Sequence, residues 1–242
     1  MHRIRLRLPK AGWVSYRHLD LIHDAIINGL IAAGASAEQV IGTTARPWNF
    51  ATLGFHHQHE GRTHGLIVST PDQALAEILA GIDPTAIRYA RASTGELCDF
   101  GDATVEPVEQ PFLPESTPMG VLALSPIAIS DRTTKRKQWQ TNFDEFDLSA
   151  AVNARLSRIA GRPVELSVQA DSLYLRANPK HSVLVSTKRM KNGRSVFVIG
   201  MQAPLVLAGS REDLLQAWYT GIGEKTRNGF GCIGLAEDGV GR

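Results

Sequence analysis

The 242-residue sequence predicts an α+β protein with two tandem ferredoxin-like units. Segments in which apolar residues alternate, as in strands, are interleaved with segments in which apolar residues recur every three or four positions, as in helices. In the first half these segments follow the order βαββαβ, which is the ferredoxin-like pattern, and the second half partly repeats it. A proline-rich stretch lies between the halves, so we expect domains over residues 1–109 and 110–242.

The first half begins with a strand over 3–8, because Ile4, Leu6 and Leu8 alternate with basic residues. A helix is expected next, with Ser15 as its N-cap residue and an end near Gly34. The remaining elements of this half are expected as strands over 48–55 and 63–69, a helix over 71–80, a fourth strand over 87–92, and a linker or extended edge over 104–118, which contains four prolines.

The second half repeats part of this order and carries a basic, partly helical insertion. We expect a strand over 120–129 and a helix over 148–160, followed by short strands over 164–168 and 172–175. A hairpin over 183–187 and 195–200, a helix over 211–219 and a last strand over 230–235 complete this half.

Composition limits the kinds of protein that this chain can be. Apolar residues make up 43% and charged residues 21%, which is ordinary for a globular protein and does not favour disorder. No apolar run reaches the ~18 residues of a membrane helix, so we expect no membrane partner. Cys98 and Cys232 lie far apart, which argues against a disulfide framework and a cysteine zinc site. A cytoplasmic location is expected on these grounds.

Charge is distributed unevenly, although the net charge is only +2. Residues 95–117 contain six acidic residues and no Lys or Arg, whereas residues 131–194 contain thirteen basic and six acidic residues. Such an asymmetry is typical of a face that binds a polyanion, because each neutralised phosphate releases counterions. A merely solvated basic surface is the alternative.

A glycine-rich loop near the C-terminus is the most specific motif. Glycines at Gly221, Gly223, Gly229 and Gly231 flank a five-residue segment that contains Lys225 and Arg227. Glycine lets backbone amides approach a phosphate closely, so the loop is a candidate phosphate site. It is not a Walker loop, because the Lys-Thr pair follows a glutamate where that motif requires glycine. A ligand-free turn is the alternative.

The loop and a second segment together resemble one protein family. A Gly-apolar-Gly pair on each side of five residues, placed before the last strand, is typical of the CRISPR-associated repeat-RNA endoribonucleases of the RAMP type. The segment 122–129, which contains Ser125-Pro126-Ile127, is similar to the strand that opens their second domain, and the segment 46–50 is also similar to that family. The unusual basic insertion after Asp131 points to a divergent branch, with the type IV systems as one candidate.

The resemblance implies tandem RRM-like domains and an RNA substrate. Family members cleave on the 3′ side of a repeat hairpin, where the 2′-hydroxyl attacks the adjacent phosphate and leaves a 2′,3′-cyclic phosphate and a 5′-hydroxyl. The implied protein is a metal-independent endoribonuclease without a cofactor, which binds CRISPR repeat RNA, stays on the mature crRNA and joins other CRISPR effector subunits. Closely related folds also serve as non-cutting RNA-binding subunits, and a small-molecule enzyme of the same fold is a further alternative.

Catalytic residues are suggested by the family's use of a histidine in or just after the first helix as the general base. His23 is our first candidate and His18 our second, because they border the apolar stripe of the expected helix on opposite sides. Tyr16 and Lys10 are candidate acids or phosphate contacts. For either histidine, a half-buried structural role is the alternative.

Basic residues in the second half form the expected RNA-binding surface. Arg155, Arg158 and Arg162 are spaced at i, i+3 and i+7, which places them on one stripe of a helix. The same surface is expected to include the run Lys135, Arg136 and Lys137, the hairpin residues Lys188, Arg189 and Arg194, and the glycine loop.

Histidines at His56, His57, His59 and His64 invite a metal interpretation. No cysteine or suitably spaced carboxylate completes a known ligand set, so we expect a polar hairpin tip and no metal site.

Overall fold

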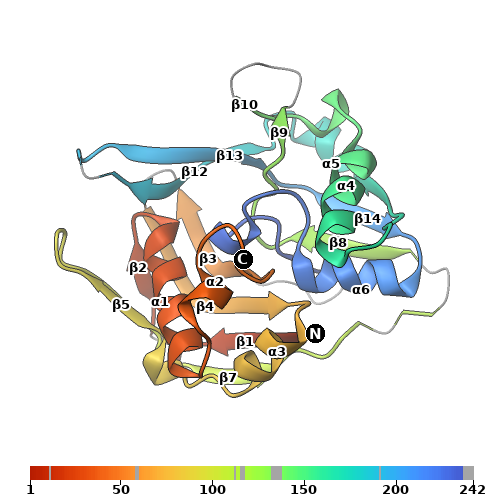
Figure 1. Cartoon of the computed structure of the whole chain (residues 1–242). Helices are drawn as coiled ribbons and strands as arrows, with labels where there is room; N and C mark the ends of the chain where they lie inside the picture. The colour runs from red at the N-terminus through yellow and green to blue at the C-terminus, as the bar shows by residue number, and fades with distance from the viewer. Residues whose placement is uncertain are drawn as a thin grey trace.

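The computed structural model describes residues 1–10, 12–57, 60–111, 113–114, 118–131, 138–190 and 192–236. Within them, two antiparallel sheets with their helices lie side by side, the first at the lower left of Figure 1 and the second at the upper right. The predicted α+β class is confirmed. No helix in this part of the chain is both long and apolar enough to span a membrane.

The first sheet has the ferredoxin-like strand order. Its four main strands are β1 (His2–Arg7), β3 (Asn49–His57), β4 (Glu60–Thr70) and β7 (Thr104–Pro107). They lie in the spatial order β3–β4–β1–β7, so that the first and third strands of the unit are central. A short strand, β2 (Val14–Tyr16), pairs with the start of β4.

Helices α1 (Leu19–Ala32) and α3 (Gln73–Ala80) cover one face of this sheet. The predicted apolar stripe of α1 is confirmed: Ile22, Ile26 and Leu30 are fully buried in the first hydrophobic core. Each such side chain contributes about 1.5–3 kcal/mol by leaving water. A single turn, α2 (Ala37–Val40), follows α1 and is closed by a capping box between Ser36 and Gln39.

The second sheet repeats the same order. Its strands β8 (Met119–Ala123), β11 (Ser167–Ala170), β14 (Pro204–Ala208) and β15 (Ile233–Leu235) lie as β11–β14–β8–β15. Helices α4 (Leu148–Ala160) and α6 (Arg211–Thr220) pack on it around a second hydrophobic core. Side chains of Asp147 and Ser210 cap the two helices at their N-termini.

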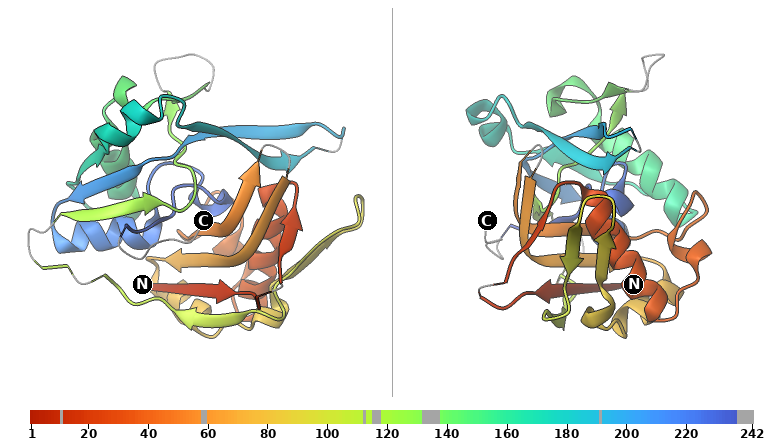
Figure 2. Two further views of the ribbon diagram at one scale, coloured as in Figure 1. Left: turned by 180° about the vertical axis from the view of Figure 1, so that it is seen from behind. Right: turned by 90° about the vertical axis from the view of Figure 1, so that its left-hand side faces the viewer.

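The smaller elements lie in the connections. They are η1 (Pro84–Ala86), β5 (Arg88–Arg91), β6 (Glu96–Asp99), β9 (Ser130–Asp131), β10 (Gln138–Trp139), η2 (Phe143–Glu145), α5 (Ser172–Ala177), β12 (Ser182–Arg189), β13 (Ser195–Met201) and η3 (Thr226–Asn228). Two of the resulting hairpins, β5–β6 and β12–β13, project beyond the sheets on the same side of the molecule, as Figure 1 and the left view of Figure 2 show.

Three predictions about local structure are wrong. Ser15 is not an N-cap residue. It lies in β2, where it pairs with Arg62 of β4, and α1 begins only after His18. The strand expected over 87–92 does not join the sheet but forms the β5–β6 hairpin, and β7 takes its place at the edge, where a proline is tolerated. The short strand expected over 172–175 lies in α5, which Asp171 caps.

One contact between the two halves lies on the face of the first sheet that α1 and α3 leave open. Ala51, Leu53 and Ile67 pack there against Cys232 of the second half. A core on each sheet supports the domains that we propose at residues 1–109 and 110–242, although Ala128, Val185, Val198 and Phe230 of the second half pack into the first core.

Candidate functional site

The glycine loop runs from the end of α6 to β15 and passes between the two halves. Gly229 lies against Phe50 and Leu19 of the first half. The Thr226 hydroxyl donates to the Trp48 carbonyl oxygen at 3.4 Å and accepts a hydrogen bond from Arg155 Nη2 of α4 at 2.8 Å. The loop therefore joins α1, the start of β3 and α4 in one place.

The loop's glycines are required by packing inside the protein. Gly231 has a φ of +68°, and a Cβ there would lie 1.7 Å from the Ile222 carbonyl oxygen. At Gly223, with a φ of +76°, a Cβ would lie 2.7 Å from the Ala128 oxygen. Both positions therefore exclude any side chain. Gly221 and Gly229 are also buried with positive φ, and contact of these backbones with RNA stays a prediction.

The outer part of the loop presents its cations. Lys225 is exposed, and among the described residues it alone has a positive φ without being glycine. That conformation costs about 1 kcal/mol or more, and such strain is concentrated at functional sites. Arg227, half-buried beside it, has a pKa that burial lowers.

Arg155 adds a third cation at the loop. Burial, together with the neighbouring guanidinium groups of Arg158 and Arg227, lowers the pKa of Arg155 to about 10, although Glu224 opposes this change. Its Nη1 atom is buried and has no hydrogen-bond partner among the described residues. Arg158 is exposed one turn further along α4. These cations repel one another, so an anion bound between them would stabilise the cluster.

His23 lies on α1 and is connected to the loop through Trp48. Its ring stacks on Trp48, with centroids 5.6 Å apart, and the Trp48 carbonyl contacts the loop through Thr226. Nδ1 of His23 lies 2.9 Å from Asp24 Oδ1, an arrangement in which Nδ1 donates and Nε2 is left as the proton-accepting nitrogen. A base oriented by a carboxylate is a typical catalytic arrangement.

His18 lies elsewhere, against the β12–β13 hairpin. Its Nε2 is 3.0 Å from Ser195 Oγ, its Nδ1 has no hydrogen-bond partner within the described part of the chain, and only 6% of the residue is exposed. Burial lowers the pKa of His18, Arg91 and Arg189 lower it further, and Asp20 and Glu96 oppose them. These contacts favour a role in holding the hairpin, and catalysis by His18 stays a prediction.

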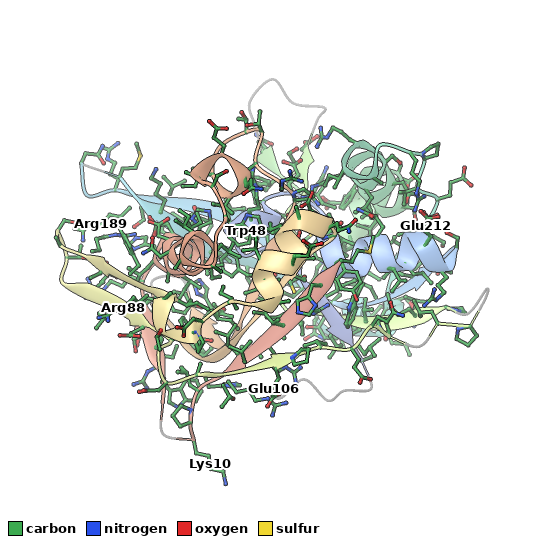
Figure 3. All side chains as sticks on the ribbon, turned by 60° about the horizontal axis from the view of Figure 1, so that its bottom comes forward. Lys10, Trp48, Arg88, Glu106, Arg189 and Glu212 are labelled. Carbon is green, nitrogen blue, oxygen red and sulfur yellow. The ribbon has the colours of Figure 1, made fainter. Side chains whose placement is uncertain are left out.

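Tyr16 is buried in β2. Its hydroxyl lies 2.9 Å from Thr52 Oγ1 and 3.3 Å from His56 Nδ1, and burial raises its pKa. A buried phenol with a raised pKa is a poor match for an acid that must reach RNA, so this geometry favours a structural role. Lys10, labelled in Figure 3, lies at the outer end of the segment that follows β1.

The predicted basic surface is divided by the fold. Arg162 Nη1 lies 2.6 Å from Asp213 Oδ1 and its Nε 2.8 Å from Glu212 Oε1, so two carboxylates of α6 already neutralise it. Lys188, Arg189 and Arg194 are exposed on the hairpin, but only Arg189 lines the open groove of about 830 Å³ beside His18, which Glu60 and Glu96 also line. Figure 3 shows Arg189 far from Trp48 and thus from the glycine loop. Lys135, Arg136 and Lys137 lie outside the described residues.

The histidine cluster is only partly described. His56 contacts Tyr16, and His64 packs edge-on against Trp13, with centroids 5.2 Å apart. The side chains of His57 and His59 lie outside the described residues. Among the residues that are described, no group of three potential metal ligands comes together.

Sequence reasoning missed Asp24 and Thr226. Asp24 was detectable in principle, because a carboxylate directly after a candidate histidine can reach its Nδ1. Thr226 had no comparable signal, because its partners Trp48 and Arg155 are distant in the sequence.

Sequence comparison defines the class to which this fold and loop belong. Residues 109–235 match the family model described as CRISPR associated protein Cas6, C-terminal, which covers more than half of the chain. The protein belongs to the Cas6 family. A comparison with curated protein sequences gives no match.

Solved structures share the fold over nearly the whole chain. A Cas6-related protein from Pyrococcus furiosus is 15% identical, with a TM-score of 0.67 and coverage of 98% of this chain and 99% of that one. A structure described as a RAMP protein binding different RNA substrates is 16% identical, with a TM-score of 0.65 and coverage of 97% and 99%. A Cas6 product complex is 16% identical, with a TM-score of 0.57 and coverage of 97% and 98%. The predicted tandem ferredoxin-like fold is confirmed.

Proposed function

We propose that this protein is a metal-independent endoribonuclease that cleaves CRISPR repeat RNA and stays bound to the mature crRNA. Membership of the Cas6 family supports the substrate. The observation that carries the activity is the position of His23, oriented by Asp24 and joined through Trp48 to a glycine loop that gathers arginine side chains.

In this mechanism His23 Nε2 accepts the proton of the 2′-hydroxyl as that oxygen attacks the adjacent phosphate. Arg155 and Arg227 stabilise the negative charge that develops on the phosphorane, and they do so strongly because they are partly withdrawn from water. The bond to the 5′-oxygen breaks, and that oxygen takes up a proton, for which exposed Lys225 is our candidate donor. The products are a 2′,3′-cyclic phosphate and a 5′-hydroxyl.

The remaining basic groups bind substrate and product. Arg158 lies on α4 and the other exposed cations lie on the β12–β13 hairpin, so one RNA that contacts both must extend over the surface between these two elements. Phosphate contacts of this kind fix the position of an RNA without reading its sequence. We also propose that the protein associates with other CRISPR effector subunits.

The test uses repeat RNA under single-turnover conditions with EDTA present. Cleavage is expected, and a single 2′-deoxy nucleotide before the scissile phosphate should abolish it while binding is retained. His23→Ala should slow cleavage by ~10²–10⁴-fold, the usual contribution of a positioned proton-transfer group. His64→Ala is the matched control and should cleave normally.

Each alternative gives a different result. Tight binding of repeat RNA without any cleavage would identify a non-catalytic RNA-binding subunit. Cleavage of the 2′-deoxy substrate, or loss of activity in EDTA or in His64→Ala, would refute the mechanism and direct attention to the histidine cluster. Normal cleavage by His23→Ala would transfer the role of base to His18.

A further inference from the structure

The proposed chemistry combines groups from both halves of the chain. His23 belongs to α1, whereas the glycine loop leaves α6 after Thr220 and enters β15 at Ile233. A displacement of about 1 Å between reacting groups can cost ~10²-fold in rate. Residues that tie both ends of the loop to the first sheet would therefore govern the reaction.

Arg3, in β1 of the first sheet, contacts both ends of the loop. Its Nη1 donates to the Trp218 carbonyl oxygen at 3.4 Å, and its Nη2 donates to the Ile233 oxygen at 2.5 Å and lies 3.7 Å from Cys232 Sγ. The guanidinium carbon lies 3.9 Å from the centroid of the Trp218 ring. Only 1% of Arg3 is exposed. One planar side chain thus joins the last turn of α6, the first residues of β15 and the first sheet.

The end of α6 provides the physical reason for this contact. The last carbonyl groups of a helix have no partner within the helix, and they form the negative end of its dipole. Here the Ala217 oxygen accepts from the Gly221 amide, the Trp218 oxygen from Arg3, and the Tyr219 oxygen from Asn49 Nδ2 at 2.7 Å. Two side chains of the first sheet therefore complete the turn from which the loop starts.

We propose that Arg3 is a positioning residue that fixes both ends of the glycine loop relative to the first sheet and α1. Asn49 supports it by a hydrogen bond to the same end of α6. This proposal rests on the proposed function for its catalytic consequence, but the position of the loop can be tested without it. Lysine cannot replace Arg3, because a single ammonium group does not reproduce a planar fork that reaches two carbonyl oxygens.

The experiment compares Arg3→Met and Arg3→Lys with Arg7→Met, a control on the same strand whose side chain is 54% exposed and pairs with Glu106 at the surface. Hydrogen exchange of amides in residues 219–235 should accelerate in both Arg3 variants, while exchange in β4 stays slow. Single-turnover cleavage should fall by ~10²-fold. The Kd for repeat RNA should change little, because the exposed cations remain. Arg7→Met should match the wild type in every assay.

Three results would overturn the proposal: unchanged loop exchange in a folded Arg3→Met variant, accelerated exchange with full cleavage, or full activity in Arg3→Lys. If Arg3→Met does not fold, Asn49→Leu removes a single hydrogen bond to the same helix end and should show the same effects at smaller size. If the wild type does not cleave repeat RNA, the proposed function fails and the exchange data alone decide whether Arg3 positions the loop.

Discussion

Replacing Arg155 by methionine should make the free protein more stable and its RNA binding weaker. Burial and the neighbouring arginines lower the pKa of this guanidinium from 12.5 to about 10. At about 1.4 kcal/mol for each pH unit, this lower pKa means that the folded protein disfavours the charged form of Arg155 by roughly 3 kcal/mol. The substitution also removes the hydrogen bond to Thr226, which contributes about 1.5–3 kcal/mol when the donor is charged. The difference between these two contributions is a net stabilisation of about 0–1.5 kcal/mol, because methionine has a similar length and packs without a charge.

Urea denaturation at neutral pH, without RNA and with saturating repeat RNA, measures both effects. Free Arg155→Met should unfold at a higher urea concentration than the wild type, and the stabilisation added by RNA should be smaller. Arg158→Met is the matched control on the same helix, since an exposed arginine changes stability by about 0.5 kcal/mol or less. A free Arg155→Met protein destabilised by more than about 1 kcal/mol, or one with unaltered RNA affinity, would refute the idea that Arg155 is held for an anion.

Three further outcomes are expected. Gly231→Ala should abolish folding or lower the free energy of unfolding by several kcal/mol. Gly161 also has a positive φ but open space around it, so Gly161→Ala should lower the free energy of unfolding by only about 1 kcal/mol; thermal unfolding measures both. His18 binds a proton less readily in the folded state, so its contribution to stability is complete above pH 6.5 and decreases as the pH falls below that value; His18→Gln should remove this part of the pH dependence in denaturation titrations. Arg162→Ala leaves the buried carboxylate of Asp213 without its ion pair and should cost roughly 2–4 kcal/mol, with the salt dependence of RNA binding unaltered.

Local signals in the sequence were sufficient for many elements. The helix over 148–160 was predicted with its observed limits, because an apolar stripe lies between a capping aspartate and Gly161, which adopts the left-handed conformation at the helix end. The β12–β13 hairpin followed from two alternating strands around Asn192-Gly193. Periodicity and turn residues describe such elements well because their stabilising contacts are close in sequence.

Elements that depend on distant partners were predicted poorly. For the proline-rich stretch that contains β7, the sequence left a linker and an extended edge as alternatives, and only pairing with β1 makes residues 104–107 an edge strand. β14 was missed, and Ser15 carried a helix-start signal that pairing with β4 overrides. Arg162 has the spacing of an RNA-binding stripe, yet its charge is neutralised by carboxylates about fifty residues further along the chain. No spacing rule reveals such a partner.

The glycine motif was located correctly, but its predicted reason was incomplete. Close approach of backbone to phosphate suggested the need for glycine, whereas the structure shows that carbonyl groups of the protein itself exclude a side chain at Gly223 and Gly231. Between the glycine pairs, the side chain of Lys225 is exposed and that of Arg227 is half-buried, so both can contact a ligand. A sequence motif can thus mark a site correctly although its glycines are required by packing within the fold and not by the ligand.

The stacking of His23 on Trp48 provides the protein with an optical reporter. The indole is only 1% exposed and lies nearly parallel to the imidazole, so water contributes little to changes in its emission. A protonated imidazole over an indole face is a cation–π pair and quenches fluorescence more than the neutral ring does. The emission of Trp48, isolated by difference from a Trp48→Phe variant, therefore depends on whether the ring of His23 is charged. The same signal would show in real time whether the proposed base gains a proton when RNA is cut.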